Sequence, residues 1–131
     1  MPGSNRVYPS TTVTNATVVT TTETVAQLSP AFSVTYDGDA IMITGTVDFT
    51  TGTGTTSVTV RCRRGNGITG TQVGVSESDT LAAGVASPIG FDFVDFPGPV
   101  AGQQYSITIQ QTGATANGAV ASVVTEYTVG S

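Results

Sequence analysis

Hydrophobic and polar residues alternate along most of this chain from residue 31 onward. The clearest run lies between Ile41 and Phe49, where Ile43 and Val47 share their face and positions 42, 44, 46 and 48 face the other way. Successive side chains of a strand point to opposite faces, so a period of two predicts a β-strand. The same pattern predicts further strands at residues 32–36, 58–63, 68–75, 89–96, 104–110 and 121–129.

The predicted strand at residues 89–96 is apolar on both faces. Phe91 and Phe93 lie on one face, and Val94 and Phe96 lie on the other. A strand with two apolar faces is normally covered on both, so we expect this one to lie between its sheet and a second body, such as a neighbouring subunit.

Turn-forming residues separate the predicted strands. Asp37-Gly38-Asp39, Gly65-Asn66-Gly67 and Asn117-Gly118 predict tight turns, because Gly, Asn and Asp tolerate a positive φ, whereas residues 76–88 predict a longer connection. No helical apolar period occurs, and about eight short strands joined by such turns are typical of a sandwich or barrel. The predicted fold class is therefore all-β, an antiparallel two-sheet sandwich.

The first 28 residues lack this regular pattern. Pro2, Gly3 and Pro9 predict a flexible or extended start, and the Thr-rich stretch that follows carries scattered valines. That stretch fits an edge strand, an arm lying along a neighbouring subunit, or a partly disordered segment. We therefore expect an N-terminal arm or anchor at residues 1–28 and a sandwich domain at residues 29–131.

The composition suggests a protein that works inside an assembly. Only 10% of the 131 residues are charged, there is no Lys, and the formal net charge is −5; average domains carry about 25% charged residues. A surface covered by Thr, Ser, Gly, Asn and Gln is weakly protected from association, although it also fits a free-standing extracellular module. The arginines Arg61, Arg63 and Arg64 are clustered, which we interpret as a strand end with its charges in solvent rather than a nucleic-acid site.

Catalytic and metal chemistry finds little support in the residue types. Without His, no Ser-His-Asp or Cys-His arrangement and no imidazole metal site is available, and the single cysteine, Cys62, falls on an apolar strand face and is expected to be buried. Carboxylates remain, at Asp92 with Asp95 and at Asp37 with Asp39. We expect no enzyme activity, no metal and no cofactor, and no apolar run approaches the roughly 18 residues of a membrane span.

The second half of the chain resembles a known family. The segments Thr-Val-Arg-Cys-Arg-Arg-Gly (59–65), Gly-Thr-Gln-Val-Gly (70–74), Gly-Phe-Asp-Phe-Val-Asp-Phe-Pro-Gly (90–98) and Gln-Tyr-Ser-Ile-Thr-Ile (104–109) follow one another. Their order, with an Asp-x-Pro-Gly corner before a Tyr-led strand, resembles the small jelly-roll domains related to tumour necrosis factor and C1q in viral and phage surface proteins. The resemblance implies jelly-roll topology and a homotrimer with aromatic residues at its three-fold axis. The candidate interface residues are Phe91, Phe93, Tyr105 and Tyr127.

These observations predict a non-enzymatic structural protein of a virus or phage particle, such as a capsid decoration, cement or spike protein. Its partners would be further copies of itself and capsid or other virion proteins, with no nucleic acid and no membrane. We expect it on the virion surface after synthesis in the host cytoplasm, since no signal peptide is visible. Two alternatives remain: an adhesin-type module that binds a receptor or carbohydrate, and a hydrolase that uses Asp92 and Asp95.

The strand alternation makes a direct prediction at Ile43. The substitution Ile43→Asp is expected to unfold the domain, because it buries an unpaired charge at a cost of several kcal/mol. Circular dichroism and thermal unfolding of the purified variant measure this effect. A variant that folds as stably as the unsubstituted chain would show that the face assignment is wrong.

Overall fold

The computed structural model describes residues 10–50, 54–112 and 120–130. Within these ranges the chain forms ten strands, and no described helix is long and apolar enough to cross a membrane. The strands in chain order are β1 (Ser10–Val18), β2 (Thr24–Leu28), β3 (Phe32–Val34), β4 (Ala40–Thr50), β5 (Thr56–Arg64), β6 (Gln72–Leu81), β7 (Ala86–Asp95), β8 (Val100–Gln103), β9 (Tyr105–Gln111) and β10 (Val120–Gly130).

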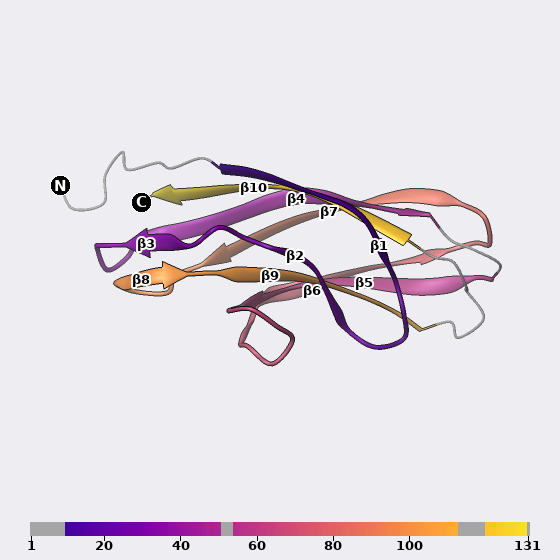
Figure 1. Ribbon diagram of the computed structural model, residues 1–131, viewed down its shortest axis with the longest axis horizontal. Coiled ribbons are helices and arrows are strands. Elements are labelled where there is room, and N and C mark those ends of the chain that lie inside the picture. Colours follow the sequence, from indigo (N-terminus) through magenta and orange to yellow (C-terminus); the bar gives the residue numbers. More distant parts are fainter. Residues whose placement is uncertain (1–9, 51–53, 113–119, 131) are drawn as a thin grey trace.

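Eight of these strands form two antiparallel sheets that lie one above the other (Figure 1). Sheet A has the order β1-β10-β4-β7 and sheet B the order β2-β9-β5-β6, while β3 and β8 form a separate short pair. If the eight sheet strands are numbered along the chain, the orders become 1-8-3-6 and 2-7-4-5, which is the jelly-roll arrangement. The predicted antiparallel two-sheet sandwich is confirmed.

The core lies between the two sheets and follows the predicted alternation. Ile43 is fully buried, whereas its neighbour Met42 is exposed on the outer face of sheet A. Val58, Val60 and Cys62 of β5 are fully buried on the inner face of sheet B. Alternation along the strands therefore assigned these inward and outward positions correctly.

One inward position of β4 has no side chain. A Cβ atom at Gly45 would collide with the carbonyl oxygen of Val124 and would lie 2.8 Å from Cζ of Phe91. Because Gly45 leaves this space empty, β10 approaches β4 closely here and the Phe91 ring fits against the strand.

Residues 10–28 contribute one strand to each sheet, which corrects the expected arm at residues 1–28 for this part of the chain. β1 pairs with β10 in sheet A, and β2 pairs with β9 in sheet B. The register shifts between Thr14 and Thr17 and between Val25 and Gln27, and each shift breaks the period of two that identifies a strand. Residues 1–9 lie outside the described residues.

The side chain of Gln27 links these N-terminal strands across the core. Its Nε2 donates to the carbonyl oxygens of Thr12 (3.2 Å) and Val123 (3.3 Å), and its Oε1 accepts from the Tyr127 hydroxyl (3.0 Å). Gln27 is buried, so these three contacts satisfy polar atoms that water does not reach. They connect β2 of sheet B to β1 and β10 of sheet A.

The region between β5 and β7 also differs from expectation. Gly65-Asn66-Gly67 does not form a two-residue turn but opens a longer loop, and β6 then runs over Gln72–Leu81 instead of residues 68–75. Most of the expected connection at 76–88 is therefore strand. Only Val73 and Leu81 of β6 are buried, so inward and outward residues hardly alternate in this edge strand and the sequence gives little sign of it.

The turn at Asp37-Gly38-Asp39 is present, with a φ of 91° at Gly38, and Asn117-Gly118 lies outside the described residues.

Deletion of residues 1–28 tests whether the first two strands belong to the domain. The truncated chain is expected not to fold, because it loses one strand from each sheet and the buried contacts of Gln27. Urea unfolding followed by circular dichroism measures this, and a chain lacking only residues 1–9, which retains every described strand, is the matched control. If the longer deletion unfolds cooperatively like the control, β1 and β2 are dispensable and this assignment is wrong.

Candidate interaction surface

The outer face of sheet A carries a polar row of side chains that crosses all four strands. The strand register places Glu126 of β10, Thr44 of β4 and Asp92 of β7 side by side, with Thr11 of β1 next to Glu126. Neighbouring positions of an antiparallel sheet lie about 5 Å apart. The row therefore brings two carboxylates onto one surface.

Apolar side chains lie on both sides of this row. Val13 pairs with Val124, and Met42 pairs with Val94; these four residues and Phe96, just beyond β7, are between 42% and 65% exposed. The expectation that the strand at 89–96 would be apolar on both faces is confirmed, and its outer face is open in the single chain. Adjacent exposed apolar residues are typical of a surface that another molecule covers.

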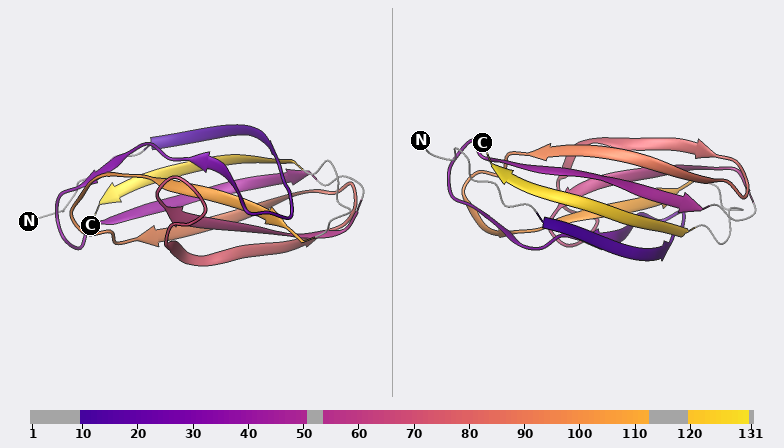
Figure 2. Two further views of the ribbon diagram at one scale, coloured as in Figure 1. Left: turned by 60° about the horizontal axis from the view of Figure 1, so that its bottom comes forward. Right: turned by 90° about the horizontal axis from the view of Figure 1, so that it is seen from above.

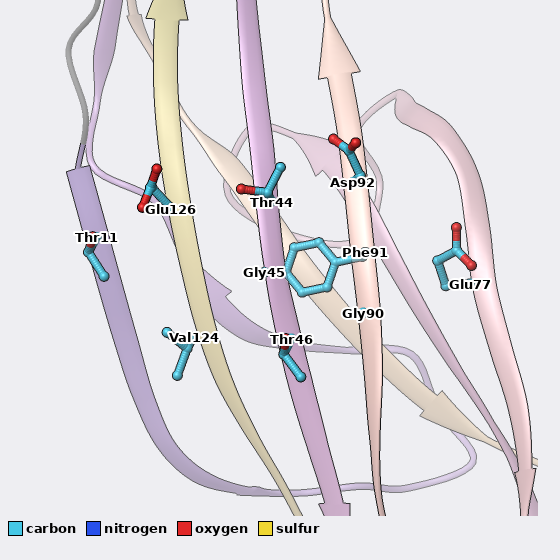
Figure 3. A pocket seen from close by; sticks show the side chains of 10 residues that line it. All are labelled: Thr11, Thr44, Gly45, Thr46, Glu77, Gly90, Phe91, Asp92, Val124 and Glu126. Carbon is cyan, nitrogen blue, oxygen red and sulfur yellow. The ribbon is translucent and has the colours of Figure 1, made fainter.

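An open groove of about 640 Å³ runs across this face. Figure 3 shows the ring of Phe91 over Gly45, with the carboxylates of Glu126, Asp92 and Glu77 around it. The other lining residues are Thr11, Thr44, Thr46, Gly90 and Val124. The described lining of the groove has three carboxylates and no arginine, so its electrostatic preference is for a cationic partner.

The outer face of sheet B is instead closed by the chain's own charges. Arg63 donates two hydrogen bonds to Glu23, at 2.6 and 2.9 Å, and Thr108 donates a third at 2.7 Å. Arg61 lies 3.7 Å from the same carboxylate and donates to Gln110. The hydrogen bond from Arg63 is the main cause of the lowered pKa of Glu23.

Arg64 points the other way, toward the end of β7. It donates two hydrogen bonds to Asp95, at 2.8 and 2.7 Å, and the Tyr105 hydroxyl donates to the same carboxylate at 2.7 Å. Burial raises the pKa of Asp95, but the hydrogen bonds from Arg64 and Tyr105 outweigh burial and lower it overall. This contact joins β7 of sheet A to β5 and β9 of sheet B.

The expectation that Arg61, Arg63 and Arg64 hold their charges in solvent is therefore wrong. Each of these arginines faces a carboxylate of its own chain. Arg61 and Arg63 lie on the same face of β5, as the period of two along a strand requires. Glu23 lies 40 residues from Arg63 in the sequence, and no local pattern connects residues so far apart.

The structure does not bring the two candidate hydrolase carboxylates together. Asp92 is exposed on the outer face of β7, whereas Asp95 is buried against Arg64 and Tyr105. The described residues contain no group of three or more Asp, Glu, His or Cys side chains that could hold a metal ion. The buried thiol of Cys62 has its pKa raised to about 12, first by desolvation and then by the nearby charge of Asp95.

The four aromatic residues expected at a subunit interface lie inside this chain's own core. Tyr105 and Tyr127 are fully buried, and Phe91 and Phe93 are at most 5% exposed. Phe91 and Phe93 stack with ring centroids 5.4 Å apart. Any surface that a neighbouring subunit contacts is formed mainly by other side chains.

The described fold is a jelly roll of the kind found in virus particles. A chain in the structure of the Gx strain of infectious bursal disease virus aligns with 95% of this chain, with a TM-score of 0.59 and 16% identity. A chain in the crystal structure of the T13 particle of the same virus aligns with 97% of it, with a TM-score of 0.54 and 14% identity. This chain spans 32% and 36% of those two chains. No protein-family model and no curated protein sequence matches it.

These similarities concern the fold, which this chain shares with chains of virus particles. At 14–16% identity they show a shared fold. The relation to tumour necrosis factor and C1q remains a prediction.

The two partly buried ion pairs, Glu23 with Arg63 and Asp95 with Arg64, predict how stability depends on pH. Glu23 and Asp95 have a lower pKa in the folded chain than in the unfolded chain, where carboxyl groups titrate near pH 4. The unfolded chain therefore binds more protons as the pH falls, and the stability that both pairs provide above about pH 5 is lost in acid. The urea midpoint should fall between pH 6 and pH 3, and it should fall less in Asp95→Asn than in Asp92→Asn, an exposed control on the same strand. An equal fall in both variants would contradict the role of Asp95.

Proposed function

We propose that this chain is a non-enzymatic structural protein of a virus particle, which acts through protein–protein contacts. The observation that carries the proposal is the outer face of sheet A, where exposed apolar side chains flank an acidic groove on a jelly-roll fold shared with chains of virus particles. On the outer face of sheet B, Arg61 and Arg63 instead lie against Glu23 of the same chain. We infer that sheet A is the side that contacts the neighbouring protein.

A decoration, cement or spike role on the particle surface is the finer form of this proposal. The low charge of the chain supports it, since a docked protein does not depend on charge repulsion to stay soluble. The sequence resemblance implies a homotrimer about a three-fold axis, but the aromatic residues expected at that axis are buried in the core. The proposal therefore rests on the open face of sheet A and not on a particular symmetry.

Purified particles from the organism that carries this sequence provide the test. An antibody raised against the recombinant chain should detect it in gradient fractions that contain intact particles. The signal should persist in about 1 M NaCl, because salt screens exposed charges but does not weaken apolar contacts. Detection only in particle-free fractions would overturn the proposal.

A rebinding experiment then identifies the face involved. The double variant Met42→Lys with Val94→Lys is expected to bind stripped particles at least about tenfold more weakly than the unsubstituted chain, because it places charges in the apolar contact. Val75→Lys on β6 changes a residue that is 80% exposed and is the matched control. Loss of binding in the control alone would assign the contact to sheet B.

A receptor- or carbohydrate-binding module is the second candidate, and the groove favours it. Its three carboxylates can accept hydrogen bonds from sugar hydroxyls. Specific binding to a glycan array that is lost in Asp92→Asn would favour this function over a structural one.

A further inference from the structure

The described sandwich has four edge strands, β1 and β7 in sheet A and β2 and β6 in sheet B. An edge strand presents unpaired backbone N–H and C=O groups and can pair with another chain, so proteins usually protect it with charges, proline, bulges or a covering element. The four edge strands differ in how many of these protective features they carry.

Three edges are protected. β6 carries Glu77 and Asp79, and its register with β5 shifts between Val60 and Cys62. β7 packs beside β6 along one side of the sandwich. β2 has only five residues, its register shifts after Val25, and Pro30 follows it closely.

β1 is the least protected of the described edges, because it lies against β2 over a much shorter stretch than β7 lies against β6. It has nine residues with the sequence STTVTNATV, which contains no charge and no proline. Its bulge lies between Thr14 and Thr17, so the register from Ser10 to Thr14 is regular. In the right-hand view of Figure 2, β1 (indigo) lies at the rim of the sheet, next to β10 (yellow).

The hydrogen bonds of Gln27 indicate which backbone groups of β1 point away from β10. Gln27 bonds to the carbonyl oxygens of Thr12 and Val123, which lie close together between β1 and β10. The Thr12 carbonyl therefore points toward β10. Because backbone groups alternate in direction along a strand, Thr11 and Val13 direct their N–H and C=O groups away from β10, to the open edge.

We propose that a second copy of this chain pairs with this edge through its own β1, antiparallel and about a two-fold axis. The pairing is self-complementary, because both copies offer the same alternating donors and acceptors and neither brings a charge to the edge. Pairing also places Val13, which is 65% exposed, beside side chains of the other copy. The inference rests on the edge alone and holds whether or not the chain belongs to a virus particle.

The contact is short, so the dimer is weak. A regular stretch of five residues buries far less than the roughly 1,200 Å² of a stable interface. We expect a dissociation constant between about 10 μM and 1 mM, the weak end of the affinity scale, and complete pairing where copies are concentrated.

Sedimentation equilibrium of the purified full chain tests the proposal. The average mass should rise with concentration from 13.2 kDa toward twice that value and stop there, because a two-fold pairing uses both β1 edges. Val13→Lys should remain monomeric at every concentration, since it brings two like charges together, while Val75→Lys on the opposite edge should associate like the unsubstituted chain.

Val13→Pro separates backbone pairing from the side-chain effect. It removes an N–H that points away from β10, so it should abolish the dimer while the urea midpoint stays close to that of the unsubstituted chain. Thr12→Pro should instead lower the midpoint, because Thr12 faces β10. A chain that stays monomeric up to about 1 mM, forms a trimer, or still dimerises as Val13→Pro overturns the proposal. None of these results depends on particle binding, which tests the proposed function separately.

Discussion

The pairing of the first described strand with the last is the contact on which the rest of this fold depends. β1 lies against β10, more than 100 residues later in the chain, and it forms the rim of sheet A. Gln27 strengthens this closure, because its buried amide joins β2 to the carbonyl oxygens of the β1–β10 ladder and to Tyr127. A polar group buried without partners would destabilise the core, so the three contacts of Gln27 allow only a narrow range of positions for the N-terminal strands.

A second polar contact holds the two sheets together at the end of β7. Arg64 of β5 and Tyr105 of β9 both donate to Asp95, so one carboxylate connects two strands of sheet B to sheet A. Charge-assisted bidentate pairs of this kind are stronger and more directional than neutral hydrogen bonds. Apolar packing is not directional. Together with the hydrogen bonds of Gln27, this ion pair therefore helps to fix how the two sheets lie relative to each other.

The two outer faces of the sandwich have different electrostatic roles. Sheet B has its arginines neutralised by Glu23 within the chain, whereas sheet A leaves Glu126, Asp92 and adjacent apolar side chains open. The three described arginines pair with carboxylates of their own chain. Most of the positive charge of the described residues therefore takes part in contacts within the fold. This asymmetry is the basis of the proposal that sheet A is the contacting side of the chain.

The sequence by itself determined the sheet class, the inward face of β4 and β5, the burial of Cys62 and the apolar outer side of β7. These features depend on alternation between adjacent residues, which a strand converts directly into opposite faces. It did not reveal β1 and β2, because their register shifts break the alternation, or the length of β6, because an exposed edge strand has little alternation. The partners of Arg63, Arg64 and Gln27 were decided only by the tertiary structure, since hydrogen bonds between residues up to 100 positions apart depend on how the sheets stack. The assignment of Phe91, Phe93, Tyr105 and Tyr127 to the core rather than an interface was decided in the same way, because apolar side chains look alike in sequence whether their own chain or a neighbour covers them.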